Sequence, residues 1–122
     1  MIEVVAAVIK REGQLLICQR PVNKKLSLLW EFPGGKVEEG EEHQAALYRE
    51  CLEELGIELL IGSFICDIYK NDDDVHISFY NAIIKNGIPV PIEHNDIRWI
   101  CISEISKYTF CPADEAILKQ IE

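Results

Sequence analysis

Positive charge is scarce in this sequence. Its 122 residues include 12 Lys and Arg against 21 Asp and Glu, which gives a formal net charge of −9. A chain this acidic repels the phosphate backbone of a nucleic acid. We therefore expect no nucleic-acid polymer as a partner. A small phosphorylated ligand remains compatible, because divalent cations can bridge its phosphates to carboxylates.

Paired cysteines and long hydrophobic runs are also missing. The cysteine count of five is odd and contains no Cys-x-x-Cys spacing, which fits neither a disulfide framework nor a zinc site. We expect reduced thiols that pack as small core residues. The apolar run at residues 4–9 is too short for a signal peptide or a membrane span, so we expect a cytoplasmic protein without membrane contact. The cysteines are Cys18, Cys51, Cys66, Cys101 and Cys111.

The residues that are present suffice for one domain with a core. The length and the hydrophobic content of 48% predict a single domain over residues 1–122, built as a mixed sheet with two or three helices. The Pro-Gly-Gly at residues 33–35 predicts a loop, and the prolines within residues 87–91 exclude a central strand there. Gly56 is expected to end a central helix. The predicted strands cover residues 2–10, 15–20, 28–32, 58–69, 75–84 and 97–101, and the predicted helices cover residues 44–55 and 112–121.

The central helix carries three glutamates on one arc. At about 100° per residue, Glu50, Glu53 and Glu54 fall on one side together with Ala46. Three like charges at this spacing repel one another unless a cation lies between them, and Mg²⁺ prefers such oxygen ligands. A plain solvated acidic face is the other interpretation. We predict that the opposite arc is buried, and it holds Ala45, Tyr48, Cys51, Leu52 and Leu55.

The sequence on either side of these glutamates favours the cation. It fits the pattern G, five residues, E, seven residues, R-E-apolar-x-E-E-x-G-apolar, which arises by chance on the order of once in 10⁹ windows. This segment resembles the Nudix box, with a cysteine where the family usually has an aliphatic residue. A thiol packs similarly, so we expect no loss of activity. The matching residues are Gly35, Glu41, Arg49, Glu50, Cys51, Glu53, Glu54, Gly56 and Ile57.

The resemblance extends over nearly the whole chain and is to the MutT-type branch of the Nudix hydrolases. Residues 30–38 are similar to the lead-in to the box in that branch, and residues 111–115 resemble its base-reading segment. The resemblance implies an α/β (α+β) fold, namely an α/β/α sandwich with a central mixed β-sheet. It also implies a metal-dependent nucleoside triphosphate pyrophosphohydrolase that converts NTP or dNTP to NMP plus pyrophosphate and helps to sanitise the nucleotide pool.

A metal centre is part of what this resemblance implies. Bound Mg²⁺ or Mn²⁺ would neutralise phosphate oxygens and activate a water for attack on phosphorus. Arg49 would orient the carboxylates, Glu41 would brace the preceding loop, and either Glu50 or Glu93 would serve as general base. The implied metal ligands are the carbonyl of Gly35 and the side chains of Glu50, Glu53, Glu54 and Glu93, and these four glutamates are the implied catalytic residues.

Substrate choice depends most on Asp114, where the oxidised-guanine branch has an asparagine. An ionised carboxylate only accepts hydrogen bonds, which suits the amino group of cytosine. Residues 3–7 and 93–94 also resemble the cytidine triphosphate pyrophosphohydrolase branch. Both (d)CTP and oxidised nucleotides such as 8-oxo-dGTP therefore stay open as substrates. The implied substrate contacts are Arg20, Phe32, Lys36, His76, Phe79 and Asp114, and the two phenylalanines fit a plain core role equally well.

Two other functions remain as alternatives. A diphosphatase for ADP-ribose or dinucleotides is disfavoured by the short loops and by the single domain. A non-catalytic nucleotide-binding module is expected to have lost the box carboxylates, which are all present here. The partner in either case is a small-molecule nucleotide, and both a monomer and a homodimer fit. The histidines at 43, 76 and 94 lack metal-ligand spacing, so we expect structural or solvated roles, with His76 at the border of the base pocket.

Overall fold

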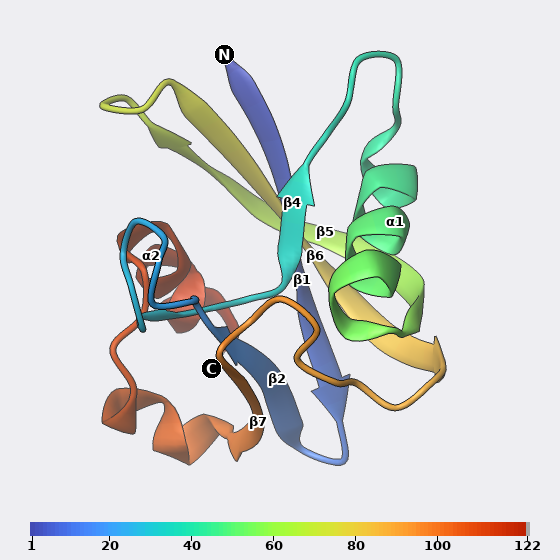
Figure 1. Ribbon diagram of the computed structural model, residues 1–122, viewed down its shortest axis with the longest axis vertical. Helices are drawn as coiled ribbons and strands as arrows, with labels where there is room; N and C mark the ends of the chain where they lie inside the picture. Colours follow the sequence, from blue (N-terminus) through green and yellow to red (C-terminus); the bar gives the residue numbers. More distant parts are fainter. Residues whose placement is uncertain (122) are drawn as a thin grey trace.

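The sheet is built around strand β1 (Ile2–Arg11) in the computed structural model, which describes residues 1–121 (Figure 1). β1 runs parallel to β6 (Val75–Asn86), and β6 pairs antiparallel with β5 (Glu58–Lys70). On its other side β1 pairs antiparallel with β4 (Gly34–Lys36) and, at its end, with β2 (Gln14–Gln19). This combination confirms the predicted mixed sheet. Two further strands pair with β2, namely β3 (Trp30–Glu31) and β7 (Asp96–Cys101).

One helix covers each face of the sheet (Figure 1). Alternate side chains of β1 point to opposite faces, as the period of two in a strand requires. Val5 packs in one core with Leu47 of α1 (His43–Leu55), whereas Val8 packs in the other core with Ile117 of α2 (Pro112–Ile121). The predicted α/β/α sandwich is therefore confirmed. Within residues 1–121 no helix has the length and apolar character needed to cross a membrane.

The structure departs from the predicted elements around the Pro-Gly-Gly segment. Instead of a loop, Gly34–Lys36 form β4, because glycine lets this backbone approach β1 where an added Cβ would collide with the carbonyl oxygen of Val5. The run predicted as extended at residues 28–32 shrinks to β3, since Leu28 is left-handed with φ 62°. The 3₁₀ helix η1 (Ile102–Lys107) was not predicted. The other predicted strands and both helices are confirmed to within two residues at each end.

The buried face of α1 also differs from the prediction. Ala45 and Leu52, predicted as buried, are exposed. Glu50 and Glu54 lie instead on the inner face, with only 16% and 15% of their side chains exposed. Their spacing repeats that of the buried residues at i, i+3 and i+4, so two carboxylates occupy positions that a core helix gives to apolar side chains. The buried residues of α1 are Ala46, Leu47, Cys51 and Leu55.

The prediction of five core cysteines is partly wrong. Cys18, Cys51 and Cys111 are buried, but Cys66 is half-buried and Cys101 is exposed. Cys101 follows the buried Ile100 at the end of β7, and the alternation of a strand turns the two side chains to opposite faces.

Candidate functional site

A cleft of about 210 Å³ opens beside residues 4–6 of β1. Its walls come from segments far apart in the sequence: β1, the loop after β2, β3 and β4, α1, β6, the segment before β7, and α2. The fold therefore assembles a site that no single segment contains. The charged or titratable side chains that line it are Arg20, Lys24, Glu31, Glu54, Glu93, His94 and Asp114.

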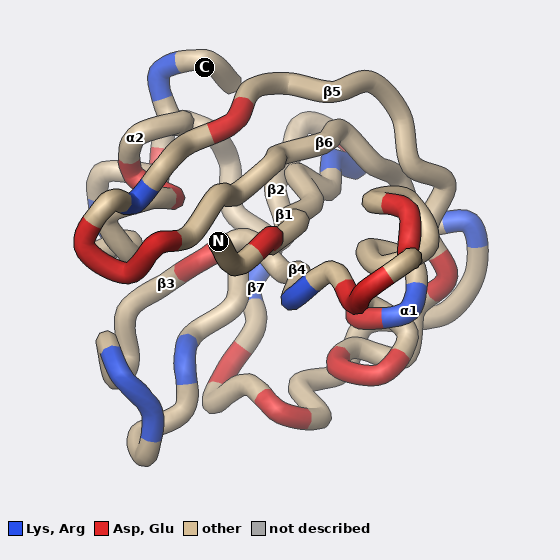
Figure 2. Tube along the Cα trace, turned by 90° about the horizontal axis from the view of Figure 1, so that it is seen from above, with Lys and Arg blue, Asp and Glu red and all other residues tan. Residues whose placement is uncertain are grey.

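Glu54 is the glutamate of α1 that lines the cleft. Burial, a hydrogen bond with Glu50, and the charges of Glu50 and Glu93 raise the pKa of Glu54 well above its usual value. Crowding of this kind disfavours ionised carboxylates, and a cation would relieve it. Figure 2 shows the acidic residues gathered along α1 and the loop before it. These oxygen donors fit a hard divalent cation such as Mg²⁺.

Gly35 brings the backbone of β4 against the carboxylate of Glu50. An added Cβ at Gly35 would collide with the Glu50 carboxylate, so a glycine is required for this contact. Gly35 also lines the cleft. The structure thus brings together Gly35, Glu50, Glu54 and Glu93, while Glu53 lies farther out with 58% of its side chain exposed. Their assignment as metal ligands stays a prediction.

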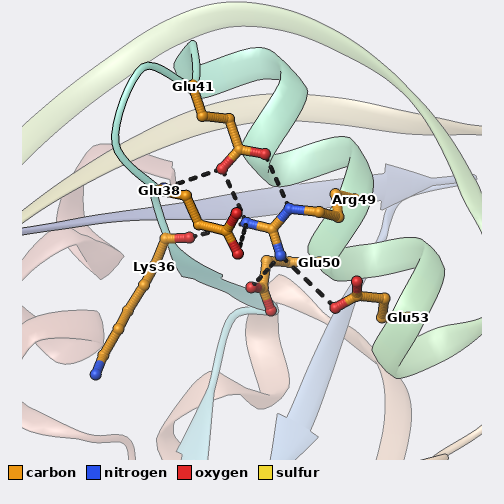
Figure 3. Close-up of polar contacts among 6 residues, drawn as sticks. All are labelled: Lys36, Glu38, Glu41, Arg49, Glu50 and Glu53. Carbon is orange, nitrogen blue, oxygen red and sulfur yellow. Dashed lines mark hydrogen bonds and ion pairs between the residues drawn. The ribbon is translucent and has the colours of Figure 1, made fainter.

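Arg49 holds the acidic residues in place (Figure 3). Its guanidinium donates to both carboxylate oxygens of Glu41, each at 2.9 Å, and to Oε1 of Glu50 at 2.8 Å. The hydrogen bond from Arg49, together with one from the backbone N–H of Glu38, lowers the pKa of Glu41 to about 2. The loop before α1 is therefore tied to the helix by a permanently charged pair. Further contacts of Arg49 are Glu53 at 3.6 Å, Glu38 at 3.8 Å and the carbonyl of Lys36 at 3.1 Å.

The segment before β7 carries Glu93 to the same cleft. Val90 donates its backbone N–H to the carbonyl of Leu55 at 3.0 Å, and Ile92 donates to the carbonyl of Glu54 at 3.2 Å. These carbonyls belong to the last turn of α1, where no intrahelical donor is available. The predicted non-strand segment at residues 87–91 thus caps the helix that carries Glu54 and positions Glu93 beside it.

Asp114 lines the cleft from the first turn of α2. It is buried, and its Oδ1 accepts a hydrogen bond from the backbone N–H of Phe32 at 2.9 Å. Burial raises the pKa of Asp114 to about 7, and the nearby charge of Glu31 acts in the same direction. Asp114 therefore carries a proton in a large fraction of molecules at neutral pH and can donate as well as accept.

Three charged or titratable residues of the cleft were not predicted as site residues, namely Lys24, Glu31 and His94. Glu31 forms an ion pair with Arg20 at 3.0 Å and lies 3.3 Å from Nε2 of His94. His94, expected to be structural or solvated, is only 4% exposed and lies between Glu31 and Glu54, which is 3.8 Å away. Glu31 could have been noticed because it is the one charged residue in the apolar run at residues 28–32. The signal for His94 was its position next to Glu93.

Three predicted substrate contacts lie away from the cleft lining. His76 is held on the α1 side of the sheet by Glu3 at 2.9 Å and Asp67 at 2.8 Å, so its placement beside the base pocket is not supported. Phe79 is completely buried in the core behind Phe32. The side chain of Lys36 points away from the carboxylates in Figure 3. Arg20, Phe32 and Asp114 do line the cleft.

Known proteins are similar to this sequence over nearly its full length. The chain is 38% identical over 121 residues to the CTP pyrophosphohydrolase of Escherichia coli (strain K12). This match covers 98% of this chain and 90% of that protein. It is also 30% identical over 124 residues to the 8-oxo-dGTP diphosphatase of Haemophilus influenzae. That match covers 99% of this chain and 91% of that protein.

Solved structures share the fold. The solution structure of the E. coli ORF135 protein superposes with a TM-score of 0.84 at 37% identity and covers 99% of this chain and 88% of that one. The crystal structure of a MutT NUDIX hydrolase from Burkholderia pseudomallei superposes with a TM-score of 0.83 at 26% identity, over 99% of this chain and 98% of that one. A family model of the NUDIX domain matches residues 1–121. The box residues on α1, the sandwich around β1 and these matches together show that the chain belongs to the NUDIX family, in its MutT-type branch.

Proposed function

We propose that this chain is a metal-dependent nucleoside triphosphate pyrophosphohydrolase that acts on cytidine-type nucleotides such as CTP and dCTP and releases pyrophosphate. The observation that carries the proposal is one cleft lined by two kinds of side chain. The carboxylates of Glu54 and Glu93 come from α1 and the segment before β7, whereas Phe32 and Asp114 come from the segment after β3 and from α2. The names of the NUDIX relatives at 38% and 30% identity support the reaction class.

The glutamates suit the metal-bound phosphates of the substrate. Glu50, Glu53, Glu54, Glu93 and the carbonyl of Gly35 would hold Mg²⁺ or Mn²⁺, whose charge offsets the negative charge of the phosphoryl group during in-line displacement. Arg49 keeps Glu50 oriented through the 2.8 Å hydrogen bond.

Basic side chains on the cleft wall suit the same phosphates. Arg20 and Lys24 both line the cleft, and they supply positive charge close to an otherwise acidic lining. Arg20 is fixed by donating from Nε to the carbonyl of Lys25 at 2.7 Å and by its ion pair with Glu31. This side of the cleft would orient the triphosphate toward the glutamates.

Glu31 and Asp114 suit cytosine. A cytosine edge offers an amino donor beside a ring-nitrogen acceptor, so its reader must supply one acceptor and one donor. A carboxylate oxygen of Glu31, which pairs with Arg20 at 3.0 Å, can accept, while protonated Asp114 can donate. Phe32 lines the same cleft but is only 3% exposed, so it would form the floor beneath the base.

Oxidised nucleotides are the second candidate. Because burial raises the pKa of Asp114 to about 7, its protonated form can also donate to a purine carbonyl of 8-oxo-dGTP. The relative from Haemophilus influenzae carries the name of that activity.

A nucleotide panel tests both the reaction and the substrate. Purified protein with Mg²⁺ is assayed for pyrophosphate and for orthophosphate with CTP, dCTP, 5-methyl-dCTP, 8-oxo-dGTP, the common triphosphates and ADP-ribose. We expect pyrophosphate from cytidine nucleotides, and near-complete loss in Glu54→Gln but not in Glu12→Gln, which changes an exposed turn residue. Inactivity on the whole panel would favour a binding module. Orthophosphate release would show that another bond is cut, and cleavage of ADP-ribose alone would favour a diphosphatase.

A further inference from the structure

One ring nitrogen of His94 lies between two carboxylates of the cleft. Nε2 is 3.3 Å from Oε2 of Glu31 and 3.8 Å from Oε1 of Glu54. Only 4% of the His94 side chain is exposed, and all three residues line the cleft. Glu31 belongs to β3 and Glu54 to α1, so a single atom contacts groups that two separate elements supply.

The position of Nε2 suits a donor shared by two acceptors. Ionised Glu31 and Glu54 repel each other, and the repulsion is strong where water is partly excluded. An N–H between two carboxylates offsets this repulsion and fixes the direction of both. Because Nε2 faces acceptors on both sides, we assign the ring proton to Nε2.

Glu31 is held at both of its carboxylate oxygens. Its Oε1 pairs with Nη1 of Arg20 at 3.0 Å, while Oε2 faces His94. Arg20 is itself fixed, because its Nε donates to the carbonyl of Lys25 at 2.7 Å. Without His94 the carboxylate would keep one of its two partners and could turn about that contact.

The backbone on either side of His94 fixes the imidazole in place. Ile92 donates its N–H to the carbonyl of Glu54 at 3.2 Å, which ties the segment to the last turn of α1. Asn95 donates its N–H to the carbonyl of Gln19 at 2.9 Å and its side-chain amide to Oε1 of Gln19 at 2.6 Å, which ties the segment to the end of β2. His94 is therefore a fixed point against which both carboxylates are set.

The other ring nitrogen shows that this histidine is not the best residue for stability. Nδ1 of His94 is buried and has no hydrogen-bond partner within residues 1–121. A buried polar atom without a partner costs free energy, and an apolar side chain of similar size would avoid that cost. The contacts of Nε2 therefore account for a histidine at this position.

We propose that His94 is a positioning residue that holds Glu31 and Glu54 at a fixed separation through Nε2. The step to catalysis rests on the proposed function, in which Glu31 reads the base and Glu54 helps to hold the metal. The imidazole would then set the distance between the bound base and the reacting phosphates. A small error in that distance is enough to slow the reaction.

Two amide substitutions separate the two ring nitrogens. The amide nitrogen of Gln reaches about as far as Nε2, whereas that of Asn reaches only as far as Nδ1. His94→Gln should therefore stay close to wild type in kcat/KM for CTP, and His94→Asn should fall by roughly 10–100-fold. His43→Asn is the matched control, because His43 does not line the cleft. Equal losses in folded His94→Gln and His94→Asn, or a smaller loss in Asn, would overturn the proposal.

Mn²⁺ binding tests the contact with Glu54 without turnover. Mn²⁺ alone is titrated into each protein and followed by electron paramagnetic resonance. We expect His94→Asn to weaken Mn²⁺ affinity roughly tenfold, the effect of losing an outer partner of a metal ligand, and His94→Gln to preserve it. Wild-type affinity in His94→Asn would contradict the proposal, provided that Glu54→Gln weakens binding. Unchanged affinity in Glu54→Gln would instead refute the metal assignment of Glu54.

A double-mutant cycle tests the contact with Glu31. If His94 acts through this carboxylate, His94→Asn should lower kcat/KM for CTP less in a Glu31→Gln background than in wild type. Strictly additive losses would show that Glu31 is not the residue positioned. Failure of wild type to release pyrophosphate would refute the proposed function, whereas the Mn²⁺ titration would still decide whether His94 positions Glu54.

Discussion

Arg49 donates from Nε and Nη2 to the two carboxylate oxygens of Glu41, each at 2.9 Å, in a two-bond fork. The same guanidinium reaches Glu50 through Nη1. Glu41 in turn accepts from the backbone N–H of Glu38 at 3.0 Å. The orientation of Glu50, which lies against the cleft residue Gly35, therefore depends on Glu41, a loop residue that does not line the cleft.

The first prediction concerns this fork. Arg49→Lys keeps the charge but cannot form two parallel hydrogen bonds, so Glu50 should lose its fixed orientation. We expect kcat to fall by roughly 10²-fold, the effect of a small misplacement near the chemistry, with the fold retained in circular dichroism. Arg98→Lys is the matched control, because Arg98 lies on the exposed part of β7 and should leave kcat unchanged. Full activity of Arg49→Lys would show that the fork is dispensable.

The second prediction concerns Gly35. In Gly35→Ala the new methyl group must push the Glu50 carboxylate aside, so pyrophosphate release should fall by at least about tenfold. Gly62→Ala in β5 is the control, because its Cβ would lie 3.3 Å from the carbonyl oxygen of Asn81, which would have to shift by only a few tenths of an ångström, far from the cleft. Equal kcat in the two variants would mean that Glu50 needs no fixed place.

The third prediction concerns base choice. Asp114→Asn always offers both a donor and an acceptor, whereas Asp114 must be protonated to donate. Because the oxidised-guanine branch has an asparagine at this place, the ratio of kcat/KM for dCTP to that for 8-oxo-dGTP should fall. The nucleotide panel measures this ratio, and an unchanged ranking of substrates would remove Asp114 from base reading.

The fourth prediction concerns stability at Asp114. Burial raises its pKa to about 7 in the folded chain, against about 4 when unfolded, so the proton-bound form favours folding. That contribution is fully present below about pH 4 and is lost as the pH rises through about 7. Asn mimics the protonated acid and keeps the acceptor for Phe32. Asp114→Asn should thus match wild type in thermal unfolding near pH 4 and exceed it above pH 7, by on the order of 1–4 kcal/mol. A difference that does not grow with pH would contradict this.

The fifth prediction has the opposite pH dependence. His76 lies between Asp67 and Glu3, and their hydrogen bonds raise its pKa above the usual value of 6.5. The stabilisation is present below about pH 6.5 and is lost as the pH rises through the folded pKa. The thermal stability of wild type relative to His76→Asn should therefore be largest near pH 6 and shrink at higher pH. A difference in thermal stability that does not change with pH would show that the neutral imidazole stabilises the fold as much as the charged one.

The reaction class was predictable from sequence because its residues are contiguous. Residues 35–57 supply the box glutamates on one helix, and α1 starts and ends within one residue of its predicted bounds. The burial of Glu50 and Glu54 could not be predicted from the sequence. A helical wheel identifies the buried face by its apolar residues, so it places glutamates on the solvent side. Only the packing of α1 on β1 shows which arc is inside.

The base-reading residues were harder to predict because they come from distant segments. Asp114 accepts a hydrogen bond from the backbone of Phe32, which is 82 residues away in the sequence. His94, in the segment before β7, contacts Glu31 in β3. No local spacing reports such contacts. β4 was missed for a related reason: two glycines after a proline read as a turn, whereas their lack of side chains serves close pairing with β1.

The parallel pairing of β1 with β6 has a consequence for synthesis. β1 is synthesised before the other strands of this sheet, yet its long parallel partner begins only at Val75. Until then the apolar residues 4–9 have no parallel partner and present an unpaired strand edge, which favours association with other chains. The nascent chain should therefore be a better chaperone client than the finished protein, and truncation within β6 should cause aggregation instead of a smaller folded core.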